Sequence, residues 1–134
     1  MQYVIDCSFS SALYLPDEES GDARNFFINL KEDDQVFVPI LWWYETVNVL
    51  NISTKRKRLN RNHISIVINL LNKMNLITDF EYGAQFAEEL FDLTQLYHVT
   101  SYDAAYLELA HRKRAKLMSL DEDLISAAKA IGIK

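Results

Sequence analysis

Four carboxylates in this sequence have the side-chain type and the placement for chemistry on a cation: Asp6, Glu45, Asp103 and Asp121. Asp6 ends a short apolar run, Asp103 lies in the first turn of a helix predicted from Ser101, and Asp121 follows another short apolar run. Two unit charges about 4 Å apart repel by ~4 kcal/mol at an effective dielectric constant near 20. If the four carboxylates converge in the fold, the set must be partly protonated or must hold a cation.

Glu45 is the most informative of the four, because it interrupts a mostly apolar helical stripe. Its neighbours at helical spacing are Leu41, Trp42, Asn48, Val49 and Ile52. Burying an isolated charge costs several kcal/mol unless the charge is paired or bound to a metal. The three histidines share no metal-ligand spacing and the only cysteine is Cys7, so the remaining donors are hard oxygens. Oxygen donors of this kind favour Mg²⁺ or Mn²⁺.

Each carboxylate also has a purely structural explanation. Asp103 and Asp121 could complement helix N-termini, an effect of about 0.3–1 kcal/mol each. Asp6 could cap the turn after its strand, and Glu45 could pair with a buried lysine or arginine. Cys7 is not expected to act as a nucleophile, because the neighbouring Asp6 anion disfavours the thiolate.

The elements that must position these acids are short apolar strands alternating with helices. Strands are predicted at residues 2–5, 35–38, 76–77, 116–118 and 131–133, and helices at 17–31, 39–53, from 60 or 62, 81–96 and 101–111. Ser8 or Ser10 is expected to cap a short helix, Asp17, Glu18 and Glu19 to fill the first turn of helix 17–31, and Ser119 with Glu122 to form a capping box. Such alternation predicts a parallel sheet covered on both faces, with ligands at the carboxyl ends of its strands.

Composition limits the alternatives. The 134 residues, 49% hydrophobic and 25% charged, predict one globular domain spanning residues 1–134. Three glycines are too few for a Walker A or dinucleotide loop, and a single cysteine excludes an intramolecular disulfide. No apolar run approaches the length of a membrane span, so we expect a cytoplasmic protein with no membrane contact. Trp42 and Trp43 cannot both face the same side of one helix, so at least one is expected to be exposed or at an interface.

Basic residues are concentrated, although the net charge is −5. Nine of the 14 lie in two clusters: Lys55, Arg56, Lys57, Arg58 and Arg61, then Arg112, Lys113, Arg114 and Lys116. Such patches could grip a polyanion locally, or could be solvated helix ends.

The motifs around the four acids resemble a known family. They read VIDCS at 4–8, VPILWWYETVNVL at 38–50, SYDAAYLELA at 101–110 and LMSLDEDL at 117–124. In order and spacing they resemble PIN domains, and more narrowly the VapC-type ribonuclease toxins of toxin–antitoxin modules. The resemblance implies a three-layer α/β/α sandwich with a central parallel sheet. It also implies an acidic pocket that binds one or two Mg²⁺ or Mn²⁺ ions and hydrolyses RNA.

Carried over position by position, the resemblance gives roles to further residues. Asp6, Glu45, Asp103 and Asp121 take the acidic places, with Asp123 as the alternative to Asp121. Ser8 and Ser119 match hydroxyl positions beside the first and fourth acids, and Asn48 is a further supporting position. The basic turn (Lys55, Arg56, Lys57, Arg58 and Arg61) is the candidate for holding RNA phosphates. A homodimer and a cognate antitoxin are expected as partners. A non-catalytic RNA-binding or assembly module and a DNA-directed nuclease remain the competing interpretations.

Overall fold

The core of the fold is a four-stranded, fully parallel sheet. The computed structural model describes every residue except 17, 18 and 20. The strands are β1 (Gln2–Ile5), β2 (Gln35–Pro39), β3 (Ile77–Asp79) and β4 (Lys116–Met118), in the order β3-β2-β1-β4. Because all four run in one direction, their carboxyl ends lie along a single edge of the sheet.

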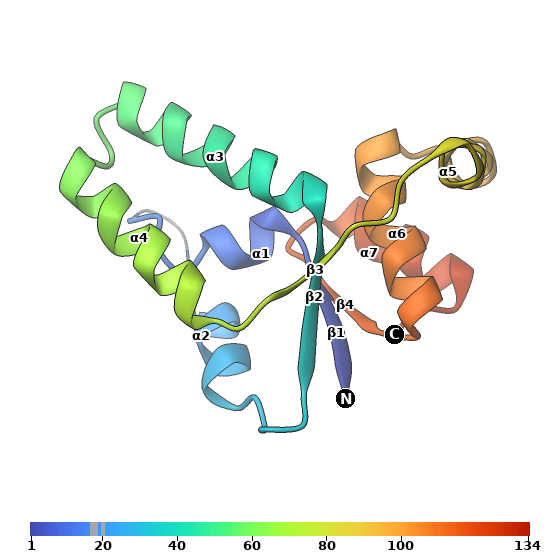
Figure 1. Ribbon diagram of the computed structural model, residues 1–134, viewed down its shortest axis with the longest axis horizontal. Helices are drawn as coiled ribbons and strands as arrows, with labels where there is room; N and C mark the ends of the chain where they lie inside the picture. The colour runs from blue at the N-terminus through green and yellow to red at the C-terminus, as the bar shows by residue number, and fades with distance from the viewer. Residues whose placement is uncertain (17–18, 20) are drawn as a thin grey trace.

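Helices cover both faces of this sheet, as the sequence predicted. On one face lie α1 (Cys7–Ser11), α2 (Gly21–Ile28), α3 (Ile40–Lys55) and α4 (Arg61–Lys73) (Figure 1). On the other lie α5 (Ala84–Tyr97), α6 (Ser101–Lys113) and α7 (Glu122–Ile131). The expected three-layer α/β/α sandwich with a parallel sheet is therefore confirmed. No helix in the described part of the chain combines the length and the apolar character needed to span a bilayer.

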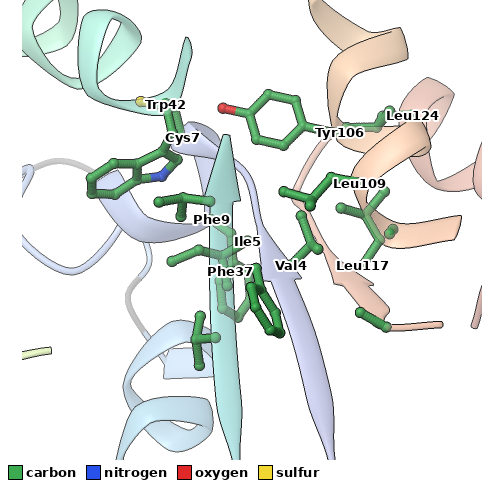
Figure 2. Packing of buried hydrophobic residues seen from close by; sticks show 14 of the residues in the cluster. Val4, Ile5, Cys7, Phe9, Phe37, Trp42, Tyr106, Leu109, Leu117 and Leu124 are labelled. Carbon is green, nitrogen blue, oxygen red and sulfur yellow. The ribbon is translucent and has the colours of Figure 1, made fainter. Parts of the chain in front are cut away.

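The central strand β1 is buried between the two helical layers. Val4 and Ile5 are fully buried, and Phe37, Leu109 and Leu117 pack around them (Figure 2). Two-sided burial explains why strands β1 and β2 end in continuous apolar residues rather than alternating ones. Helix α6 is buried over seven consecutive residues, from Ala104 to Ala110, which fixes the helix firmly against the sheet.

Two predicted elements are wrong, one in extent and one in type. The helix expected at 17–31 is α2, Gly21–Ile28, and it ends early because Lys31 and Asp34 form a turn, with the Lys31 N–H on Asp34 Oδ2 at 2.9 Å. Glu19 lies outside the helix, whereas Asp17 and Glu18 lie outside the described residues. The strand expected at 131–133 is instead the end of α7, where Gly132 adopts the left-handed conformation that favours a helix C-cap.

Candidate active site

Asp6 lies at the carboxyl end of β1 and is held by three donors. Its Oδ1 accepts hydrogen bonds from the Phe9 N–H at 2.9 Å and from Ser8 Oγ at 2.8 Å, and its Oδ2 accepts one from Ser119 Oγ. Asp6 is thus the N-cap of α1, as its structural explanation had it, and the expected caps Ser8 and Ser10 are not. Burial raises the pKa of the Asp6 carboxyl and the nearby Asp121 adds to this effect, although the three hydrogen bonds oppose it.

Pairing of β1 with β4 brings the loop after β4 to Asp6. Ile5 lies opposite Met118, so Ser119 is placed beside Asp6. Ser119 Oγ also accepts the Asp121 N–H at 2.9 Å, and the Leu120 N–H donates to Ser8 Oγ at 3.1 Å. The expected capping box of Ser119 and Glu122 is wrong, because α7 begins at Glu122 and the residue directly before it, Asp121, is the N-cap.

Asp121 is the N-cap of α7 in place of Ser119. Its Oδ1 accepts hydrogen bonds from the Asp123 N–H at 2.9 Å and the Leu124 N–H at 3.3 Å. Its structural explanation, a carboxylate at a helix N-terminus, is therefore correct. The same residue also lies near enough to Asp6 and Asp103 to raise the pKa of both carboxyls, so the cap and the acidic cluster share it.

Glu45 lies in the second turn of α3 and has a phenol partner. Tyr106, on α6 in the opposite layer, donates its hydroxyl hydrogen to Glu45 Oε1 at 2.5 Å. The buried lysine or arginine considered from the sequence is thus replaced by a tyrosine. Burial raises the pKa of Glu45, and the charges of Asp6 and Asp103 act in the same direction against the bond from Tyr106.

Asp103 lies in the first turn of α6, and Thr100 is the N-cap of that helix. Thr100 Oγ1 accepts the Asp103 N–H at 3.1 Å. Partial burial raises the pKa of Asp103, and so do the neighbouring charges of Asp121, Asp6 and Asp123, in that order. These mutual effects show that the four predicted acids lie within electrostatic reach of one another, near the carboxyl end of β1 that Asp6 follows.

The cluster has the donor chemistry of a site for a hard cation. Its side chains offer carboxylate oxygens, and their raised pKa values show that negative charge there is poorly compensated. A divalent ion would relieve this excess. Within the described ranges, no three histidine, cysteine or acidic side chains are already arranged around a common ion position. The hydrogen-bond partners of Asp6 and Glu45 include hydroxyl groups: Ser8 and Ser119 donate to Asp6, and Tyr106 donates to Glu45.

Comparison with known proteins identifies the family. A profile described as PIN domain matches residues 3–130. The chain belongs to the PIN domain family. A PIN domain relative, Ribonuclease VapC3 of Pyrobaculum aerophilum, is 29% identical over 131 residues, which are 98% of each chain.

Two solved structures share the fold of this PIN domain. PAE2754 from Pyrobaculum aerophilum superposes with a TM-score of 0.67 at 21% identity, covering 96% of this chain and 86% of that one. VapC20 of Mycobacterium tuberculosis, a sarcin-ricin loop cleaving toxin, gives a TM-score of 0.70 at 18% identity, covering 93% and 94%.

The remaining predicted residues lie farther from the acids of this PIN domain. Asn48 is exposed one turn after Glu45 and lines a surface hollow with Trp43, Tyr44 and Val47. Of the two tryptophans, Trp42 is fully buried and Trp43 is exposed, as their adjacency predicted. The basic turn joins α3 to α4, and its first residue is ten positions along α3 from Glu45, or about 15 Å at the helical rise.

Sequence reasoning missed two groups of residues. Tyr106 follows Asp103 by three residues, so helical spacing puts both on one face, and that spacing was the available signal. The second group is Arg112 with Asp79 and Glu108. Arg112 donates two hydrogen bonds to Asp79, at 3.0 and 2.6 Å, and two to Glu108, at 2.7 and 3.1 Å. Burial opposes ionisation of Asp79, but the Arg112 guanidinium holds the pKa of that carboxyl below its usual value.

Proposed function

We propose that this PIN domain is a Mg²⁺- or Mn²⁺-dependent endoribonuclease of the VapC type, acting as the toxin of a type II toxin–antitoxin pair in the cytoplasm. The observation that carries the proposal is the cluster of four carboxylates at the carboxyl edge of the sheet, three of them with raised pKa values. The similarity to Ribonuclease VapC3 over nearly the full length supports the same activity.

In this proposal Asp6, Glu45, Asp103 and Asp121 hold the ion. When bound, Mg²⁺ or Mn²⁺ supplies a Lewis acid for a phosphate oxygen and lowers the pKa of a coordinated water. Asp121 is preferred to Asp123 as the fourth acid, because Asp121 influences both Asp6 and Asp103 whereas Asp123 influences Asp103 alone among the resolved shifts.

The chain's own groups orient these ligands and handle the proton. Ser8 and Ser119 fix both oxygens of Asp6, so its carboxylate presents a defined face to the cluster. A carboxylate with a raised pKa is well suited to accept the proton of the attacking water. In-line attack by water at phosphorus expels the 3′-oxygen, so the products carry a 5′-phosphate and a 3′-hydroxyl.

Substrate phosphates outside the cluster are assigned to the basic turn. Lys55, Arg56, Lys57 and Arg61 are exposed there, and Arg58 is half-buried. Lys57 adopts a left-handed backbone conformation (φ 57°), which lets the chain reverse between α3 and α4 while keeping the cations together. Contacts of this kind weaken as salt rises, because phosphate binding releases condensed counterions.

Protein partners are assigned to the exposed apolar side of α3. Tyr44 is 69% exposed, Val47 60% and Trp43 37%, and a groove continues from Val47 to Ile64 and Ile68 on α4. This apolar face, close in sequence to Glu45, supports the expected antitoxin and a second copy of the chain as partners.

The decisive experiment is cleavage of an end-labelled, single-stranded RNA by the purified protein with Mn²⁺ or Mg²⁺ and with excess chelator. The wild type should cleave only with metal and leave 5′-phosphate ends, whereas Asp6→Asn and Asp103→Asn should be inactive. Asp33→Asn, an exposed carboxylate between α2 and β2, is the matched control and should cleave like the wild type. Cleavage that survives the chelator would contradict the metal-dependent mechanism.

The same assay separates the competing functions. A matched DNA strand that is cut as fast as the RNA would favour a DNA-directed nuclease. RNA binding without cleavage, under every metal condition, would favour the non-catalytic module.

A further inference from the structure

Tyr106 is a buried residue whose hydroxyl group makes a hydrogen bond to Glu45. The side chain is 2% exposed and belongs to the core, where its ring lies beside the carboxyl end of the sheet (Figure 2). The hydroxyl oxygen points from α6 toward the layer that contains α3. There it donates its hydrogen bond to Glu45 Oε1 at 2.5 Å.

The bond joins residues 61 positions apart on helices that cover opposite faces of the sheet. Glu45 receives no other hydrogen bond from the residues that the structure describes, so this single contact orients its carboxylate. Tyr106 is a firm support, because every residue of α6 from Ala104 to Ala110 is buried. The opposite oxygen, Oε2, stays available to a second ligand.

We propose that Tyr106 is a positioning residue, which holds Glu45 at the acidic cluster so that the Glu45 carboxylate can take part in divalent-ion binding. This inference rests on the proposed function, since it assigns a support to one of the proposed ligands. Hydrogen-bond partners that orient metal-ligating carboxylates affect metal affinity by about 10- to 100-fold. Tyr106 touches neither the ion nor the RNA in this assignment and acts through Glu45.

A merely structural role is the alternative, in which the bond only ties the two helical layers together. The two roles differ in what removal of the hydroxyl changes. A structural tie would lower the melting temperature without changing the affinity of the folded protein for the ion. A positioning role changes the affinity of the folded protein, and it does so only while Glu45 is present.

The test is calorimetric titration of the full chain with Mn²⁺ alone. Four proteins are compared: the wild type, Tyr106→Phe, Glu45→Gln and the double variant. Tyr106→Phe keeps the buried ring and removes only the oxygen, and near-ultraviolet circular dichroism checks that each variant is folded. We expect Tyr106→Phe to weaken the Kd for Mn²⁺ about 10- to 100-fold. The double variant should bind no more weakly than Glu45→Gln, within about twofold.

Tyr14→Phe is the matched control. Tyr14 also has a buried hydroxyl, but among the described residues it has no hydrogen-bond partner. Loss of that oxygen should leave the Kd for Mn²⁺ unchanged. In RNA cleavage, Tyr106→Phe should need more Mn²⁺ for its half-maximal rate by the same factor as its loss of affinity, and should approach the wild-type rate at saturation.

The outcomes distinguish this inference from the proposed function. Normal Mn²⁺ binding by the wild type with unchanged affinity in Tyr106→Phe would overturn the inference alone. If the double variant loses Mn²⁺ affinity by the product of the two single-variant factors, the inference is also overturned, because Tyr106 would then act independently of Glu45. A wild type that binds no Mn²⁺ would overturn both.

Discussion

Replacing Asp103 by asparagine separates the two opposing effects of the acidic cluster on the protein. The asparagine keeps the shape of the side chain and the backbone N–H bond to Thr100, but it removes one negative charge. Without metal, the folded state disfavours that charge, because burial and the carboxylates of Asp121 and Asp6 raise the pKa of Asp103. The variant should therefore be more stable than the wild type in chelator, by up to about 1 kcal/mol after solvent screening of a partly exposed group.

With metal the order reverses. An ion at 100 times its dissociation constant stabilises the protein that binds it by ~2.7 kcal/mol. An unfolding entropy of about 2.1 cal/mol/K per residue gives roughly 0.28 kcal/mol/K for a domain of this length, so the wild-type Tm should rise by about 10 °C. Asp103→Asn, having lost a ligand, should show little of this increase.

The assay is a thermal melt of both proteins in chelator and across a Mn²⁺ series. Asp33→Asn, with its charge change far from the cluster in sequence, controls for a general effect of net charge. The reasoning is refuted if the wild type gains no more than about 1 °C at saturating Mn²⁺, or if Asp103→Asn keeps the full increase.

Three further predictions follow from the same contacts. The stability advantage of Asp103→Asn in chelator should be small near pH 4 and grow toward pH 7. Because the pKa of Asp103 is raised, the folded wild type binds more protons than the unfolded chain above about pH 4, so this group lowers wild-type stability as pH rises. A difference in urea midpoint that stays constant across that range would contradict the prediction. Arg112→Met should lower the free energy of unfolding in urea by about 2 kcal/mol, between the ~1 kcal/mol of exposed ion pairs and the 3–5 kcal/mol of buried ones. The intermediate value is expected because Arg112 is 32% exposed and its partners Asp79 and Glu108 are 15% and 8% exposed. An unchanged urea midpoint would show that these ion pairs do not contribute to stability. Cys7 should resist iodoacetamide at pH 8 in the native protein and react in urea, because the side chain is buried and burial raises the pKa of its thiol to about 11. Mass spectrometry measures the labelling, and rapid labelling of the native protein would be inconsistent with a buried thiol.

Local sequence signals predicted the sheet well. Strands 2–5 and 116–118 have the predicted bounds, because each is an apolar run closed by a polar residue at the end of a buried strand. The placement of Asp6 at the end of the first strand then follows from the pattern. The family resemblance put Ser119 beside the fourth acid, Asp121, and its bond to Asp6 became visible only in the pairing of β1 with β4.

Contacts between layers could not be predicted in the same way. The phenol that holds Glu45 comes from a helix 61 residues later, so its choice depends on how two layers dock, which no local pattern encodes. The capping box failed for a different reason, because Asp121 rather than Ser119 is the N-cap of α7 and accepts the N–H groups of Asp123 and Leu124.

The adjacency of the first and last strands has a consequence for when the proposed activity can appear. During synthesis β1 emerges from the ribosome well before its neighbour β4, whose Met118 pairs with Ile5. Until β4 is made, Asp6 lacks the hydrogen bond from Ser119, and until α6 is made, Glu45 lacks the hydrogen bond from Tyr106. A truncated or half-folded chain therefore carries two of the four acids without their supports, and competence to cut RNA would arise only when the largest loop of the topology closes.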